Sequence, residues 1–175
     1  MTKSRFIKSF FALTGFCLLL IDGQSKQIYY SDYIYEPEIQ TVQFFKSGSL
    51  YSYPILELGN PNESLLLSFD DLSGSRKDFQ YTIIHCDANW QPSDLLTSQY
   101  IDGSTYESII NYQSSFNTFQ PYTHYWLYLP GNYMKPKING NYILKVYNAD
   151  NEDSLVITRR FYVYQNKILI SATVK

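Results

Sequence analysis

Residues 140–148 read GNYILKVYN, and the predicted fold depends most on this stretch. After the initial Gly-Asn pair, the apolar side chains of Tyr142, Leu144 and Val146 occupy alternate positions. The charged Lys145 lies between the last two of them. Successive side chains of an extended chain point to opposite faces, so the apolar side chains share one face and the lysine lies on the other. The stretch therefore predicts a β-strand with one buried face.

The same pattern recurs along the chain in short apolar runs separated by Gly, Pro, Asn and Ser. Six further runs are predicted to be strands: 39–45, 54–58, 64–71, 78–88, 122–129 and 154–164. The connections between them are too short for the crossovers that parallel strands require, so antiparallel pairing is predicted. Seven or eight such strands fit two sheets packed face to face. We therefore predict an all-β, antiparallel, immunoglobulin- or fibronectin-like β-sandwich over residues 37–165.

Tyr142 gives a second indication of this fold. It enters a late strand directly after a Gly/Asn turn, which is the arrangement of the tyrosine corner in immunoglobulin-like sandwiches. In that motif the tyrosine hydroxyl forms a hydrogen bond with the backbone a few residues upstream. We therefore predict a structural hydrogen bond for the Tyr142 hydroxyl.

The first 23 residues have the layout of a secretory signal peptide. Three basic residues precede the apolar run FFALTGFCLLLI at 10–21, and polar residues follow it. This run is too short for a membrane span, which needs about 20 residues. We predict a signal peptide over 1–23, a tyrosine-rich leader arm over 24–36, and an exported protein that does not span the membrane. A buried N-terminal helix and an uncleaved anchor are the alternatives.

Export would change both the charge and the cysteine content of the chain. Cleavage after residue 23 removes three basic residues and one acidic residue, so 11 Lys and Arg remain against 15 Asp and Glu. A net charge of about −4 without basic clusters argues against nucleic acid and anionic membrane surfaces as partners. Cys86 is then the single cysteine, so no internal disulfide is expected.

The segment YTIIHCDANW, residues 81–90, places a histidine, a cysteine and an aspartate side by side. Alternation along a strand puts His85 and Asp87 on one face, and Cys86 on the other face with Ile84. Neighbouring strand residues diverge, so His85 cannot act as a base for Cys86. We expect the Cys86 face to be the core face, and Cys86 to be a buried free thiol.

His124 and the adjacent Asp70 and Asp71 are the remaining candidates for chemistry. His85, His124 and Asp87 would supply three zinc ligands across strands, but no recognisable ligand motif connects them. The two aspartates splay apart, whereas glycosidase carboxylates must face one bond, so we expect them to solvate the following turn. The sequence contains no phosphate-binding loop, nucleophile elbow or zinc-protease motif. We predict no enzyme activity, and we assign no catalytic, cofactor-binding or metal residues.

Residues 90–120 depart from the regular spacing of the strands and form a long polar and aromatic segment. A loop of this length in a compact domain is typically functional or contains irregular structure of its own. We expect the segment to pack over one end or edge of the sandwich, with Trp90 anchoring its first turn. We also expect it to be the part of the domain that contacts a partner.

Trp90 and Trp126 suggest an alternative function. Sandwich domains that bind carbohydrate stack the sugar on an exposed aromatic ring beside polar groups, so a carbohydrate-binding or adhesion module is the second hypothesis. Such a module would present one of these indoles flat and exposed. Aromatic side chains in alternating strands more often pack in the core or on the sheet surface.

Six segments, taken in order, resemble one known family. They are SYPILEL (52–58), SLLLSFDDLSG (64–74), FQYTIIHCDANWQPSDL (79–95), FNTFQPYTHYWLYLP (116–130), GNYILKVYNADNED (140–153) and ITRRFYV (157–163). Together they resemble the N-terminal domain of the plug protein of the type IX secretion system of Bacteroidota. The resemblance extends from about residue 35 to the end of the chain.

The resemblance implies an exported, non-enzymatic β-sandwich on the periplasmic side of the outer membrane. Proteins of this family dock on the outer-membrane translocon and close its channel while no substrate is in transit. The implied partner is the translocon protein, with no cofactor and no small-molecule substrate. A plug would present a broad convex surface without a ligand-sized cleft. Family members are longer, so residues 166–175 are expected to begin a following, truncated region.

Overall fold

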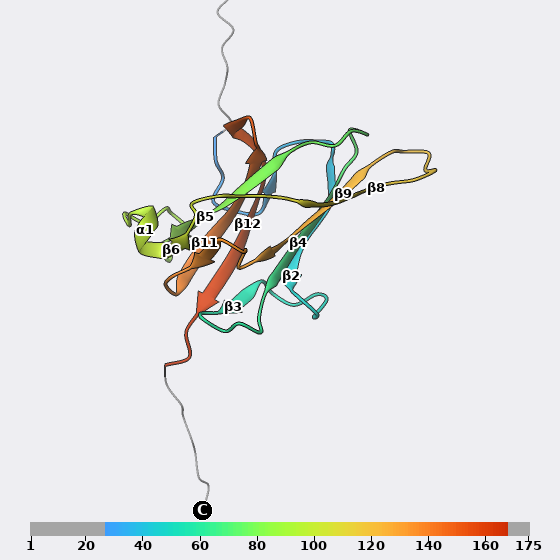
Figure 1. Cartoon of the computed structure of the whole chain (residues 1–175). Helices are drawn as coiled ribbons and strands as arrows, with labels where there is room; N and C mark the ends of the chain where they lie inside the picture. Colours follow the sequence, from blue (N-terminus) through green and yellow to red (C-terminus); the bar gives the residue numbers. More distant parts are fainter. Residues whose placement is uncertain (1–26, 168–175) are drawn as a thin grey trace, which may run out of the picture.

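The computed structural model describes residues 27–167 (Figure 1). Its elements are β1 Tyr33–Ile34, β2 Ile39–Lys46, β3 Ile55–Glu57, β4 Leu65–Asp71, β5 Phe79–Cys86, α1 Thr97–Tyr100, β6 Ile101–Gly103, β7 Glu107–Ser108, β8 Asn111–Ser114, β9 Thr123–Leu129, β10 Met134–Pro136, β11 Gly140–Asn148 and β12 Asn151–Tyr164. Within these residues, no helix has the length and apolar character that crossing a membrane requires. The predicted signal peptide and most of the predicted following region lie outside the described residues.

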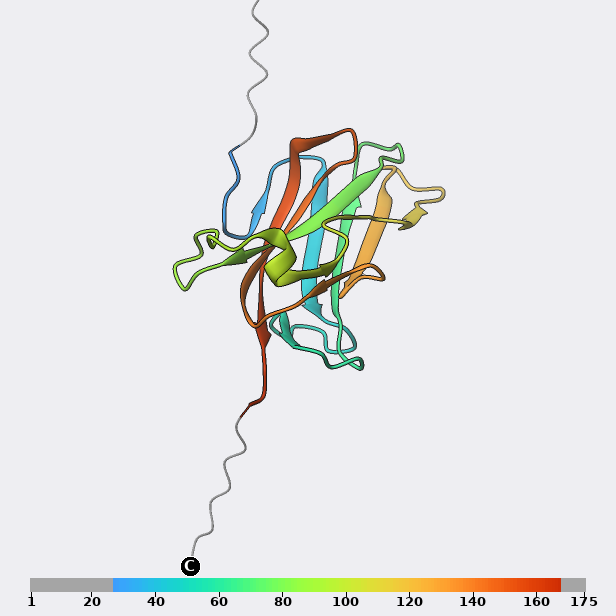
Figure 2. The same cartoon turned by 60° about the vertical axis from the view of Figure 1, so that its left-hand side comes forward.

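The strands form two main sheets that pack face to face (Figures 1 and 2). Sheet A has the strand order β1-β12-β11-β5-β7, and β3 also pairs with β12. Sheet B has the order β2-β4-β9-β8, and β6 and β10 form a separate two-stranded ladder. The predicted all-β sandwich is therefore confirmed.

Each of the seven predicted runs forms a strand, in order β2, β3, β4, β5, β9, β11 and β12. The ladders of the described residues are antiparallel, except that β3 lies parallel to β12, with Leu56 opposite Val163. The prediction of antiparallel pairing is wrong for this one pair. The lengths of the short connections do not constrain this pair, because almost the whole domain separates the two strands in the sequence.

An aromatic cluster lies in the core between the sheets. Phe69 of β4, Phe79 of β5 and Tyr125 of β9 contact one another, with ring centroids 5.0, 5.3 and 5.5 Å apart. All three side chains are buried. Leucines of β4 and β9 surround them on sheet B: Leu65, Leu67, Leu127 and Leu129. Because aromatic rings bury large areas in defined geometries, this cluster holds the two sheets in one arrangement.

Tyr142 forms the predicted tyrosine corner. Its ring is fully buried and stacks on Phe161 of β12, with centroids 5.2 Å apart. Its hydroxyl donates a hydrogen bond to the carbonyl oxygen of Ile138 at 2.9 Å, four residues upstream. The prediction is confirmed, and the bond ties the turn before β11 to the core.

Residues 90–120 cross from one sheet to the other, and they add a strand to an edge of each. β7 pairs with β5 at the edge of sheet A, and β8 pairs with β9 at the edge of sheet B. Between β5 and β7, the side chains of Tyr100 and Ile101 pack into the core. The expectation that this segment packs over an edge is confirmed, and the structure extends it to both sheets.

Candidate functional site

Strand β5 carries both His85 and Cys86, and the structure reverses their predicted faces. The core-facing side chains of this strand are Phe79, Tyr81 and Ile83. His85 continues this face opposite Tyr142 of β11, whereas Cys86 is buried on the outer face of sheet A. The assignment of Ile84 and Cys86 to the core face is therefore wrong. Both faces of the segment carry apolar residues, so alternation could not choose between them, and pairing with β11 decided it.

His85 is packed among aromatic rings. Its ring lies 5.1 Å from that of Tyr142 and 5.9 Å from that of Tyr100, and its Nδ1 lies 2.9 Å from Ser93 Oγ. Burial lowers the pKa of His85 below its ordinary value of 6.5. The imidazole is thus a neutral packing residue at neutral pH.

The lowered pKa of His85 predicts a loss of stability in mild acid. As the pH falls through 6.5, the unfolded chain binds a proton at this histidine before the folded chain does, so the free energy of unfolding falls until the pH passes below the lowered pKa of the folded state. One proton sets an upper limit of about 1.4 kcal/mol per pH unit. Urea unfolding between pH 7.5 and 5.5 measures this slope, and H85Q should reduce it. The control H124Q should leave the His85 contribution in place; equal slopes for H85Q and the unmodified chain would contradict the prediction.

Cys86 is a buried free thiol close to Tyr30 of the leader arm. Burial raises the pKa of its thiol to about 11, and nearby Asp87 adds to the effect. Asp87 itself forms the following turn, where its Oδ1 accepts hydrogen bonds from the backbone N–H groups of Asn89 and Gln91 at 2.8 and 2.9 Å. A thiol that stays protonated at neutral pH is a poor nucleophile, so Cys86 acts as a buried packing residue, as predicted.

The other candidate residues, His124, Asp70 and Asp71, lie on sheet B, apart from His85 and Cys86 on sheet A. His124 is on β9 of sheet B, where its Nδ1 lies 2.6 Å from Asp70 Oδ1 on the outer face. Asp71 is on the core side and fully buried; its Oδ1 accepts a hydrogen bond from the Ser73 backbone, and its Oδ2 lies 3.1 Å from Lys77 Nζ. The two aspartates splay apart as predicted; Asp71 binds the following turn through Ser73, as expected, whereas Asp70 pairs with His124 instead. Among residues 27–167, no group of three His, Cys, Asp or Glu side chains is arranged to hold a metal ion.

Arg160 fastens the leader arm to the outer face of sheet A. Its guanidinium donates two hydrogen bonds to the carbonyl oxygen of Tyr30, at 2.9 and 2.8 Å, and its backbone N–H donates to Asp32 Oδ1 at 2.7 Å. The same guanidinium lies over the Trp90 ring, 4.3 Å from the centroid, and that ring contacts Tyr162 edge-on. Trp90 therefore anchors the turn after β5, as predicted, and its face is occupied by arginine.

The outer faces of the two sheets differ. On sheet A the outward side chains Cys86, Ile143 and Tyr147 are buried, because the arm and the segment after β5 contact this face. On sheet B, Trp126 is partly buried beside His124, and Tyr128 is 46% exposed. The outer face of sheet B is therefore the more accessible of the two.

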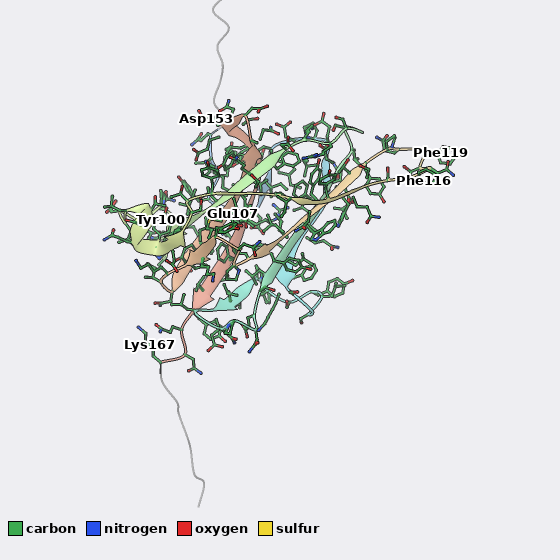
Figure 3. The ribbon with its side chains drawn as sticks, viewed as in Figure 1. Tyr100, Glu107, Phe116, Phe119, Asp153 and Lys167 are labelled. Carbon is green, nitrogen blue, oxygen red and sulfur yellow. The ribbon has the colours of Figure 1, made fainter. Side chains whose placement is uncertain are left out.

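Large apolar side chains are most exposed on two connections at opposite ends of sheet B. The β8–β9 connection, residues 115–122, carries Phe116 and Phe119, and the β2–β3 connection carries Tyr51 and Tyr53. In Figure 3, Phe116 and Phe119 project at the end of the hairpin, beyond both sheets. The sequence predicts a partner surface over residues 90–120 but does not single out these two phenylalanines.

Two open grooves have the size of a small-molecule site, contrary to the expectation for a plug. One, of about 560 Å³, lies between the arm, β2 and β12 and includes Val42, Phe44 and Arg159. The other, of about 580 Å³, lies near the end of β12, between the turn after β3 and the residues around Pro130. Neither groove is lined by Trp90 or Trp126.

A comparison with protein families identifies the family to which this β-sandwich belongs. Residues 39–165 match the model of the type 9 secretion system plug protein, first domain. The chain belongs to the type 9 secretion system plug family. At the level of the family, the match supports involvement in type IX secretion.

A solved structure shares the fold of the plug domain. The crystal structure of a hypothetical protein from Parabacteroides merdae aligns with a TM-score of 0.73 and 31% sequence identity, over 78% of this chain. The present chain spans 34% of the length of that protein. A second structure, the alkylpurine DNA glycosylase AlkC of Pseudomonas fluorescens bound to DNA, has a TM-score of 0.37 and 10% identity, which is too low to carry an argument. No curated protein matches the plug chain.

Proposed function

We propose that this domain is an exported plug that docks on the periplasmic side of the outer-membrane type IX translocon and closes its channel when no substrate is in transit. The observation that carries the proposal is the family match over residues 39–165. The signal-peptide pattern of residues 1–23 agrees with export.

The physical properties of the domain suit obstruction. A compact domain of this length has a radius of gyration of about 14 Å and hence a diameter of about 37 Å. The aromatic core around Phe69, Phe79 and Tyr125 makes the two sheets one rigid body. Such a body blocks a protein-conducting channel by its bulk, without making or breaking a bond. A modest interface of about 1,200–2,000 Å² is enough to dock it and still lets it dissociate.

A conductance measurement tests the proposal. The translocon, purified without its plug, is reconstituted in a planar bilayer, and the chain is added to the periplasmic side. We expect the conductance to fall in a saturable manner, whereas the unfolded chain or addition to the opposite side should leave it unchanged. An unchanged conductance at high chain concentration would refute channel closure.

A carbohydrate-binding module is the second candidate function. The observation in its favour is the position of Trp126 on the accessible face of sheet B, in register with Ser68 and Asn111. Against it, Trp90 is covered by Arg160, and the two grooves contain no tryptophan. The conductance experiment separates the two functions, because a sugar-binding module would not close the channel.

A further inference from the structure

The hairpin between β8 and β9 ends in a tip, residues 115–122, that presents two phenylalanines to solvent. Phe116 is 94% exposed, and Phe119 is fully exposed. Both side chains lie at the far end of the hairpin, away from the two sheets (Figure 3). Large apolar side chains gathered on a protruding element are typical of an interaction site, because contact with water leaves them unfavourably solvated.

Hydrogen bonds hold the tip in one conformation. The Ser115 backbone N–H donates to the Tyr122 carbonyl oxygen at 2.8 Å, and the Tyr122 N–H donates back to Ser115 Oγ at 2.9 Å. The hydroxyl of Thr118 lies 3.0 Å from the carbonyl oxygen of Gln120, whose side-chain amide donates to the Leu72 carbonyl oxygen at 3.0 Å. The tip is thus braced internally and against the β4–β5 turn. A preordered backbone loses little conformational entropy on binding.

The distribution of charged residues around the tip indicates what kind of partner it binds. Residues 108–134 contain no Asp, Glu, Lys or Arg, so inserting the tip into an apolar site desolvates no charge. The basic residues of the neighbouring turn, Arg76 and Lys77, are each paired with a carboxylate, Asp78 at 2.8 Å and Asp71 at 3.1 Å. Membrane-docking loops need basic groups that are available for anionic headgroups. The tip therefore fits an apolar pocket of a protein better than a lipid surface.

We infer that the tip is the anchor of the plug, and that Phe116 and Phe119 insert into an apolar pocket of the outer-membrane translocon. This inference rests on the proposed function and adds the residues that dock. Two aromatic side chains seated in a desolvated pocket can dominate the binding energy of an interface, while the rest of the domain supplies shape and excludes water.

The test measures the affinity of the chain for detergent-solubilised translocon. We expect the double variant F116S/F119S to bind about 10- to 100-fold more weakly. The matched control is Y51S, because Tyr51 is 92% exposed and lies at the other end of sheet B. The loop of Tyr51 follows Lys46, which pairs with Leu65 at the start of β4. The tip precedes Thr123, which pairs with Asp71 at the end of β4. The length of β4 therefore separates the two loops by about 20 Å. Y51S should change the affinity by less than about threefold.

Both variants should unfold at the same temperature as the unmodified chain, since the replaced side chains are exposed. A photo-crosslinking residue at position 119 should capture the translocon, and one at position 51 should not. Unchanged affinity of F116S/F119S, with the unmodified chain binding, would overturn the inference and leave the plug function standing. Tip-dependent binding to phospholipid vesicles that lack the translocon would overturn it in favour of membrane insertion. No binding by the unmodified chain would overturn the proposed function, and the inference with it.

Discussion

Replacement of Tyr125 by alanine is expected to destabilise the domain by about 4–8 kcal/mol, which is comparable to the whole stability of a typical domain. The fully buried ring contacts Phe69 and Phe79, so its removal leaves a cavity that costs about 3–5 kcal/mol. Its hydroxyl accepts a hydrogen bond from the Lys77 backbone N–H at 2.8 Å and donates to the Lys77 carbonyl oxygen at 3.0 Å. Leaving these two groups without partners costs about 1–3 kcal/mol more.

Two further variants separate these contributions. Y125F keeps the ring and loses the hydroxyl, so it should cost about 1–3 kcal/mol. Y128A removes the same residue type from the same strand, but on the outer face, where Tyr128 is 46% exposed, and it should cost about 1 kcal/mol or less. Urea unfolding monitored by tryptophan fluorescence measures all three values. Equal losses for Y125A and Y128A would show that the aromatic cluster does not carry the core.

Alanine at position 103 is expected to destabilise the domain by about 2–5 kcal/mol. Gly103 has a φ of +93°, which side-chain-bearing residues rarely adopt, and it pairs with Met134 in the β6–β10 ladder. A Cβ atom there would overlap the carbonyl oxygen of Tyr133, a backbone atom that already accepts a hydrogen bond from the Ser104 N–H at 2.6 Å. The ladder would have to open, and Met134, a buried core residue, would move with it.

Gly48 offers the matched control for this substitution. Its φ of +79° is similar, but an added Cβ would meet no heavy atom within 4 Å. G48A should therefore show only the backbone strain, about 1 kcal/mol. In a domain of this size each kcal/mol lowers the melting temperature by about 3 °C, so thermal unfolding distinguishes the two variants. A melting temperature for G103A equal to that of G48A would mean that the Tyr133 carbonyl has room to move.

The candidate site was only partly predictable from the sequence. Residues 90–120 stood out as a partner surface because they break the spacing of the strands, and that assignment stays a prediction. The exposure of Phe116 and Phe119 did not follow from it, since aromatic residues near strands are usually packed. One signal was present, the absence of charged residues over 108–134, but it indicates an apolar surface without placing that surface in the core or in water.

The sequence by itself determined the seven predicted strands, the sandwich and the tyrosine corner of Tyr142. These features are local, since alternation along a run and a turn before it are sufficient to specify them. Only the tertiary structure decided that His85 rather than Cys86 faces the core, that β3 lies parallel to β12, and that Asp70 meets His124. Each of these depends on how segments that are far apart in the chain pair with one another. A shift of one residue would move every side chain to the other face, and local periodicity does not settle that choice where both faces carry apolar residues, as in β5.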